Sequence, residues 1–188
     1  IRIVGSLKLN AVSTPVNKTF ADQLRAAAGS RPILLAASTH SPEEQILLKA
    51  SQEVVRAGYP HLLIIAPRHS NRSQDIARLM PQAAHRSKNQ LPLLGDNHFL
   101  ADSFGEMSSL VTAADIVILG GSFVPKGGHN PLEIAALSTP LITGPSQFKN
   151  KVEFDTLQQY GQCITVKDGA ALVKQLIIWL EALRIDGR

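Results

Sequence analysis

The sequence predicts an α/β fold in which helices cover both faces of a mostly parallel sheet. Four short apolar runs are nearly continuous, which is typical of strands buried on both sides. Segments with apolar residues at helical spacing lie among them, as expected when each new strand is reached through a helix. With 188 residues, 44% hydrophobic and 18% charged, the chain can form one such three-layer domain and is too apolar to be disordered.

Strands and helices are expected in a regular order along the chain. The predicted buried strands are 32–37, 61–66, 115–119 and 140–143, with weaker strands near 84–88, 97–101 and 162–166. Apolar spacing predicts one helix within 42–57 and another from Leu172 to Leu183, whose stripe favours core packing over a binding groove. The chain starts at Ile1 without an initiator Met, so we interpret residues 1–17 as a lead-in from a missing N-terminal domain and 18–188 as the folded domain.

Composition and charge exclude several classes of protein. No apolar run approaches the roughly 20 residues that span a bilayer, and the first residues lack a signal-peptide pattern. The single cysteine, Cys163, cannot form an internal disulfide, and no Cys/His cluster has zinc spacing. We assign the Cys163 thiol a structural role.

The net charge of +4 is compatible with an anionic ligand, a membrane surface or nucleic acid. Only 5% of the residues are aromatic, which is few for a surface that stacks bases. Five basic residues against one acid lie between Arg68 and Lys88. This stretch is either a solvated helix and loop or an anion-binding surface.

Ligands of a parallel sheet bind at the carboxyl ends of its strands, so the segments that follow the strands are the candidate site. These segments are 38–44, 67–71, 102–106 and 120–133. Three pairs in them have the spacing of a capping box: Ser41 with Glu44, Ser103 with Glu106, and Asn130 with Glu133. Each pair therefore has a purely structural explanation as a helix start.

The segment 120–133, GGSFVPKGGHNPLE, has four glycines within nine residues. A turn rarely needs so many, and close approach of the backbone to a ligand is the alternative. We expect free amide donors at a helix N-terminus beside Lys126 and His129, with Arg68 adding a positive charge, which suits a phosphate. Glu133 is a candidate either to cap the helix or to accept bonds from both hydroxyls of a ribose. The segment is neither a Walker A loop nor a GxGxxG motif.

The same segment, with Leu141-Ile142-Thr143-Gly144-Pro145 after it, resembles the C-terminal half of the Kdo transferases. These enzymes transfer 3-deoxy-D-manno-octulosonic acid (Kdo) to lipid A precursor. Shorter matches support the resemblance, which covers nearly the whole chain: Gly5-Ser6-Leu7-Lys8, Ala66-Pro67-Arg68-His69 and Ser103-Phe104-Gly105-Glu106. The chain departs from the family at Phe104, where Met is frequent, at Ile134, where Pro is common, and at Ser146-Gln147, which replace His-Thr.

The resemblance implies a Rossmann-like three-layer sandwich with a mostly parallel sheet, one half of a two-domain GT-B glycosyltransferase. It implies that this half binds the CMP part of CMP-Kdo through three segments. The implied donor-site residues are Pro67, Arg68, Phe104, Gly105, Glu106, Asn130, Pro131, Leu132 and Glu133, to which we add Gly127, Gly128 and His129 of the glycine-rich loop. No residue of the chain is predicted to be catalytic, because the family's general base is a carboxylate of the N-terminal domain.

The resemblance further implies an inverting, metal-independent glycosyltransferase of lipopolysaccharide biosynthesis that needs no cofactor. The full-length protein is expected at the cytoplasmic face of the bacterial inner membrane, with the lipid A precursor bound by the N-terminal domain. The present residues are expected to be soluble, to bind CMP-Kdo without turnover and not to bind nucleic acid. Two alternatives stay open: a GT-B half that uses a UDP-sugar, and a non-catalytic module that binds an anion or nucleic acid through the Arg68–Lys88 stretch.

Overall fold

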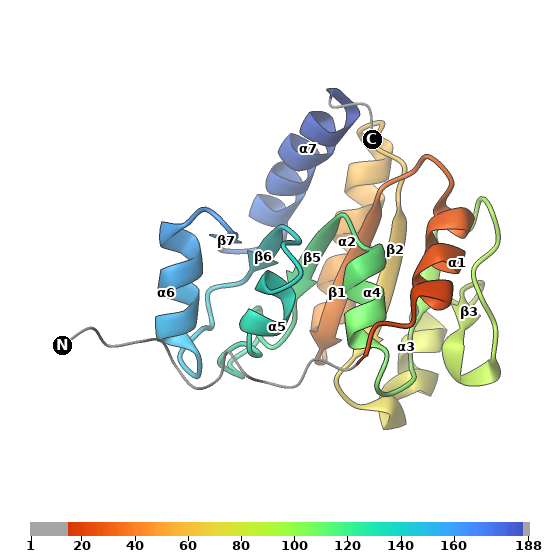
Figure 1. The fold of residues 1–188 in the computed structure, drawn as a ribbon, viewed down its shortest axis with the longest axis horizontal. Helices are drawn as coiled ribbons and strands as arrows, with labels where there is room; N and C mark the ends of the chain where they lie inside the picture. The colour runs from red at the N-terminus through yellow and green to blue at the C-terminus, as the bar shows by residue number, and fades with distance from the viewer. Residues whose placement is uncertain (1–14, 186–188) are drawn as a thin grey trace.

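The computed structural model describes residues 15–185 and shows a seven-stranded sheet between two layers of helices (Figure 1). The strands are β1 (Ile33–Thr39), β2 (Leu62–Pro67), β3 (Ala84–His85), β4 (His98–Leu100), β5 (Ile116–Leu119), β6 (Leu141–Thr143) and β7 (Cys163–Thr165). The helices are α1 (Lys18–Ala28), α2 (Glu43–Arg56), α3 (Ser73–Leu79), α4 (Met107–Ala113), α5 (Leu132–Ala135), α6 (Lys151–Gln159) and α7 (Gly169–Ile185), with 3-10 turns η2 (Ser70–Arg72) and η3 (Arg86–Lys88). Every predicted strand and both predicted helices are present, displaced by a few residues at most.

The strand order is β3-β4-β2-β1-β5-β6-β7, and each neighbouring pair is parallel. From the central strand β1 the chain builds outward on one side through β2 and on the other through β5. The chain therefore reverses its direction of winding between β1 and β5, and the carboxyl edge at this switch point is where a parallel sheet favours a ligand. The fold predicted from the apolar runs is confirmed.

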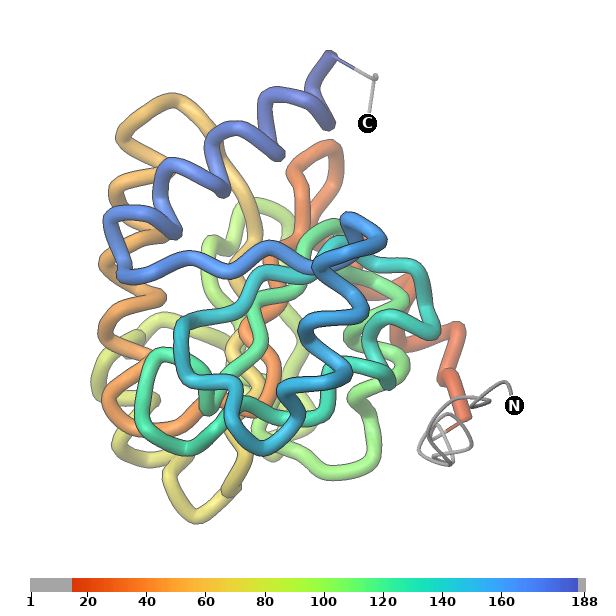
Figure 2. The backbone as a smooth tube through the Cα atoms, turned by 90° about the vertical axis from the view of Figure 1, so that its left-hand side faces the viewer, coloured from red at the N-terminus to blue at the C-terminus, as the bar shows by residue number. Residues whose placement is uncertain are grey.

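The alternation of side chains along each strand divides the core between the two faces. In β1, Ile33 and Leu35 pack with α1, α4, α5 and α6, whereas Leu34 and Ala36 pack with α2, α3 and α7. Figures 1 and 2 show α1 and α4 on one side of the sheet and α2 beside α7 on the other. Because both faces are covered, β1 has apolar residues at five successive positions, 33–37, and its sequence does not alternate with polar residues there.

Two features noted in the sequence fall on residues that the structure does not describe. Most of the predicted lead-in 1–17, and the matching residues Gly5-Ser6-Leu7-Lys8, lie there. The first described helix, α1, is capped by Asn17, whose Oδ1 accepts a hydrogen bond from the Phe20 amide at 3.1 Å.

Within residues 15–185, no helix has the length and apolar composition needed to cross a membrane.

Candidate functional site

A small cavity of about 150 Å³ lies at the carboxyl edge of the sheet, beyond β1, β2 and β4 and beside α5. Its lining includes six predicted site residues: Pro67, Arg68, Phe104, Gly105, Glu106 and Glu133. They come from three segments that are far apart in the sequence. The tertiary structure thus brings together the three segments to which the resemblance assigned the nucleotide, although their contacts with a nucleotide remain predictions.

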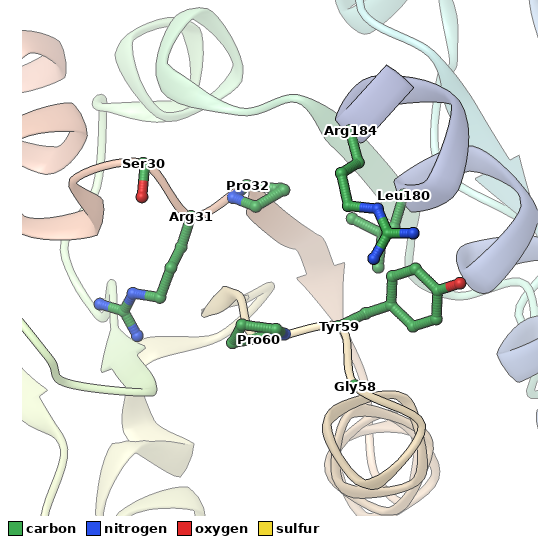
Figure 3. A pocket seen from close by; sticks show the side chains of 8 residues that line it. All are labelled: Ser30, Arg31, Pro32, Gly58, Tyr59, Pro60, Leu180 and Arg184. Carbon is green, nitrogen blue, oxygen red and sulfur yellow. The ribbon is translucent and has the colours of Figure 1, made fainter. Parts of the chain in front are cut away.

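A cavity of similar size, about 170 Å³, lies at the opposite edge of the sheet (Figure 3). The turns that lead into β1 and β2 form it together with α7, through residues such as Pro32, Tyr59 and Arg184. None of the predicted site residues lines it. In a parallel sheet this amino edge is not where ligands bind. The candidate site is the carboxyl-edge cavity in which all three predicted segments meet.

Arg68 supplies positive charge to the site. It directly follows β2, and its amide donates to the Thr39 carbonyl at 3.0 Å, which ties it to the end of β1. Its side chain is exposed, and no carboxylate within residues 15–185 forms a salt bridge with it. Beside it, the Phe104 ring is 73% exposed. The mouth of the cavity therefore offers an unpaired guanidinium and a bare aromatic face.

Glu106 has a different role from the predicted helix cap. Its carboxylate accepts hydrogen bonds from Arg86 Nε and Nη2, the shortest at 2.7 Å, and from the Ser103 hydroxyl. The Arg86 guanidinium holds the pKa of Glu106 below its usual value. The capping-box interpretation of Ser103 and Glu106 was wrong, because Glu106 is itself the N-cap of α4 and makes no side-chain capping bond. Glu106 is therefore an ionised side chain in the cavity wall, already bound by Arg86 and Ser103.

The glycine-rich loop contradicts the expectation of free amide donors. Glu43, which is fully buried, accepts hydrogen bonds from the amides of Gly121 (2.8 Å), Ser122 (3.0 Å) and Phe123 (2.9 Å), and a fourth from the His40 amide (2.9 Å). The protein's own carboxylate thus binds the amides at the start of the loop, so these amides are not free for an anionic ligand. The Ser41 to Glu44 capping box was also wrong: α2 has no side-chain cap, and Glu44 instead pairs with Arg72 at 2.7 and 2.9 Å.

The other glycine amides of the loop have protein partners as well. Gly120 donates to the Ala37 carbonyl (2.8 Å), Gly127 to the Ser146 hydroxyl (3.0 Å) and Gly128 to the Gly121 carbonyl (2.8 Å). We therefore correct the role predicted for the amides of Gly127 and Gly128. They do not present free N–H groups to a phosphate.

The glycines are required by packing against the protein itself. A Cβ at Gly120 would lie 2.4 Å from the Ser38 carbonyl oxygen. One at Gly128 would lie 2.9 Å from the Phe154 ring, and Gly128 has a φ of +70°, which disfavours other residues. The inference that the backbone approaches something closely was right, but its neighbour is the protein and not a ligand.

The end of the loop fits the prediction better. The Asn130 side chain accepts a hydrogen bond from the Leu132 amide at 3.1 Å, directly before the short helix α5, whose N-cap position is the buried Pro131. Glu133 is exposed, and no hydrogen bond to its carboxylate is found among residues 15–185. Of its two candidate roles, capping is therefore not used, and the carboxylate is available at the cavity wall.

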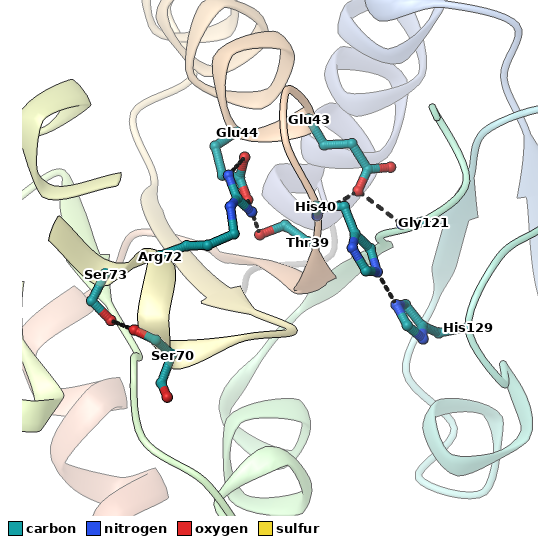
Figure 4. A network of polar contacts seen from close by, with 9 residues as sticks. All are labelled: Thr39, His40, Glu43, Glu44, Ser70, Arg72, Ser73, Gly121 and His129. Carbon is teal, nitrogen blue, oxygen red and sulfur yellow. Dashed lines mark hydrogen bonds and ion pairs between the residues drawn. The ribbon is translucent and has the colours of Figure 1, made fainter. Parts of the chain in front are cut away.

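Two histidines of the neighbouring loops are in direct contact, which the sequence analysis missed. His40 follows β1, His129 follows β5, and their Nε2 atoms lie 2.9 Å apart with the rings stacked (Figure 4). His69, after β2, lies edge-on to His40 at 5.6 Å between centroids. Burial and the nearby positive groups lower the pKa of His129 to about 4, and the same causes lower the pKa of His40. The sequence held one signal for this cluster: each of the three histidines follows a predicted strand, and the three strands are neighbours in the sheet.

No cluster of three or more His, Cys, Asp or Glu residues able to hold a metal ion occurs within residues 15–185. Cys163 is buried, and burial raises the pKa of its thiol to about 12, in agreement with a structural role.

The sequence was compared with protein-family models and with curated proteins. No family model matches the chain. A 3-deoxy-D-manno-octulosonic acid transferase of Haemophilus influenzae is 35% identical over 183 residues, which cover 94% of this chain and 43% of that protein. The enzyme of the same name from Rickettsia felis is 32% identical over 92% of this chain and 38% of its own length. The chain thus spans about two fifths of the length of these relatives.

Solved structures agree with the sequence relatives. The C-terminal CMP-Kdo binding domain of WaaA from Acinetobacter baumannii superposes with a TM-score of 0.72 at 27% identity, covering 87% of this chain and 95% of that domain. WaaG, a glycosyltransferase involved in lipopolysaccharide biosynthesis, has a TM-score of 0.55 at 14% identity over 94% of this chain. The second likeness shows the fold alone, that of a glycosyltransferase domain.

Proposed function

This chain belongs to the Kdo transferase family, as the counterpart of its C-terminal GT-B domain, and from that premise we propose that it binds the donor CMP-Kdo. The observation that carries the proposal is the convergence of Pro67, Arg68, Phe104, Gly105 and Glu133 on one cavity at the carboxyl edge of the sheet. A cavity at the carboxyl edge of a parallel sheet, where charged side chains such as Arg68 and Glu133 stand beside the Phe104 ring, is typical of a nucleotide site.

In the proposed arrangement, the exposed carboxylate of Glu133 accepts hydrogen bonds from the two ribose hydroxyls. Arg68 neutralises the phosphate, and the cytosine lies near Phe104 and Gly105. Charge-assisted bonds of this kind are stronger than neutral ones, because one partner is ionised. The amides of residues 120–123 take no part, since Glu43 and Ala37 already bind them.

We propose that a carboxylate on the N-terminal domain removes a proton from a hydroxyl of the lipid A precursor. The resulting oxygen forms a bond to the anomeric carbon of Kdo as the bond to the CMP oxygen breaks, with inversion. Negative charge grows on the departing phosphate, where Arg68 is positioned to stabilise it; one preorganised donor contributes about 2.7–4 kcal/mol in comparable sites. The transfer then needs no metal ion, and these residues alone bind the donor without turnover.

The remaining features belong to the whole protein and are part of the same proposal. Residues 18–188 form the donor domain, and the acceptor site and general base lie on a second domain. The full-length enzyme works at the cytoplasmic face of the inner membrane, where its lipid acceptor resides.

Calorimetric titration of the chain with CMP and with UDP tests the donor. We expect CMP to bind and UDP to bind at least tenfold more weakly. Glu133→Gln should weaken CMP binding by about 1–3 kcal/mol, because a charged hydrogen-bond partner is lost, whereas the same substitution at Glu53, on α2, should change nothing. Equal affinity for the two nucleotides, or unchanged CMP affinity in Glu133→Gln, would contradict the proposed site, and Kdo transfer by this chain alone would contradict binding without turnover.

Binding that falls steeply with salt, responds to Lys88→Gln and ignores Glu133→Gln would instead favour a non-catalytic anion-binding module. A chelator should leave CMP affinity unchanged if no metal is involved.

A further inference from the structure

The contact between His40 and His129 joins the two loops that diverge at the switch point of the sheet. The Nε2 atoms lie 2.9 Å apart, and the rings are nearly parallel, with 9° between their planes. Both rings are partly buried, and Figure 4 shows them pointing toward each other. A hydrogen bond between two ring nitrogens needs one proton, which one Nε2 donates and the other accepts.

This geometry limits the pair to a single additional proton. If one ring becomes an imidazolium by protonation at its Nδ1, its Nε2–H still donates to the neutral ring, and the bond becomes charge-assisted and stronger. If both rings were protonated, both Nε2 atoms would carry hydrogens, and the contact would be repulsive. The pair can therefore exist as a neutral pair or as a pair with one positive charge.

The charges that face the pair come from four loops. The β1–α2 segment contributes Glu43 and Glu44, but Glu43 is bound by four backbone amides, and Glu44 by Arg72 and the Thr39 hydroxyl. The positive neighbours are Arg68 and Arg72 after β2, Lys126 after β5, and Lys149 after β6, and the His69 ring also faces the pair. Arg68, Lys126 and Lys149 form no salt bridge with another residue in the 15–185 range.

In the free protein, burial first and then these positive charges disfavour protonation of the pair, and Arg68, Lys126 and Lys149 have no paired carboxylate among residues 15–185. An anionic group that enters among these residues removes the repulsion and favours the charged form of the pair. By linkage, the anion then binds more tightly wherever a proton is available.

We propose that His40 and His129 form a proton-linked subsite for an anionic group of the donor, and that the pair takes up one proton when this group enters. The anionic group is an oxyanion, either the phosphate or the carboxylate of the sugar acid. The proposal rests on the proposed function, because it needs a donor at the carboxyl edge, and it adds two residues that the nucleotide cavity does not include.

Calorimetry in buffers of different ionisation enthalpy measures the protons taken up on binding. At pH 6.5 we would titrate the chain with cytidine, CMP and CMP-Kdo. CMP has its own phosphate ionisation near pH 6, so the quantity to compare is the difference between wild type and His129→Asn. We expect no difference for cytidine and an additional uptake of about 0.5 proton in wild type for the anionic ligand. A difference with CMP identifies the phosphate as the linked group, and a difference with CMP-Kdo alone identifies the carboxylate.

His40→Asn should abolish the additional uptake as His129→Asn does, and His98→Asn, at the amino end of β4, should retain it. Thermal unfolding of each variant checks that it is folded. If a variant does not fold, the proton uptake of wild type with cytidine can still be compared with its uptake with the anionic ligands. CMP and CMP-Kdo binding with no more proton uptake in wild type than in both variants would overturn the subsite and leave the proposed function intact. Failure of wild type to bind either ligand would overturn both.

Discussion

Replacing Glu43 by glutamine tests whether a buried carboxylate, and not a ligand, organises the glycine-rich loop. Oε1 accepts from the amides of Ser122 and Phe123, and Oε2 accepts from those of His40 and Gly121. The glutamine side chain keeps one oxygen in nearly the position of a Glu43 carboxylate oxygen and has an NH₂ group in place of the other oxygen. Two of the four amides then face a donor and lose their acceptor.

Each buried donor left without a partner costs about 1–3 kcal/mol, so Glu43→Gln should lower the free energy of unfolding by about 2–6 kcal/mol. Domains of this size are typically stable by only 5–15 kcal/mol, so the effect should be obvious in urea unfolding followed by circular dichroism at pH 7. The matched control is Glu53→Gln on the same helix, where a surface substitution should change stability by less than about 0.5 kcal/mol.

A loss below about 1 kcal/mol in Glu43→Gln would refute this reasoning. It would mean that the loop amides find other acceptors at little cost, and that Glu43 is not what holds the loops after β1 and β5 together.

Three further predictions concern the same framework. Gly128→Ala should destabilise the fold by about 1–3 kcal/mol more than Gly161→Ala, since both have φ near +70° but only Gly128 has a ring within 2.9 Å of the new Cβ; equal losses in urea unfolding would contradict the packing explanation. Arg86→Gln should cost about 1–2 kcal/mol at pH 7 through the lost bonds to Glu106. Because the folded pKa of Glu106 is lowered, the part of the difference that comes from Glu106 should be full above its unfolded pKa of about 4.3 and decrease as the pH falls from there through the lower folded pKa, and a difference constant down to pH 3 would be inconsistent with it. The Cys163 thiol, with its pKa raised to about 12, should react with a thiol reagent at pH 8 only in denaturant, so rapid labelling of the folded chain would disprove its burial.

The sequence alone was sufficient for the fold, and it indicated the edge of the sheet at which the candidate site lies. Residues 33–37 and 62–66 are apolar at successive positions because helices cover both faces, so the pattern of a parallel sheet was readable without coordinates. The motifs at Pro67-Arg68, Ser103–Glu106 and Asn130–Glu133 indicated the carboxyl edge, since parallel strands all end there. The Kdo transferase resemblance was visible in the same residues and is confirmed by the relatives.

The tertiary structure alone decided which polar groups are already bound. Glu43 lies 78 positions before Gly121 in the sequence, so nothing local shows that its carboxylate fills the loop that we had expected to be free. The same holds for Glu106 with Arg86, 20 positions apart, and for His40 with His129, 89 positions apart. Side-chain hydrogen bonds between separate loops depend on the distance and direction that packing creates. A spacing rule such as the capping box considers only residues that are close in sequence. It cannot include hydrogen-bonding groups from distant segments, such as Arg86 beside Glu106, that folding brings close.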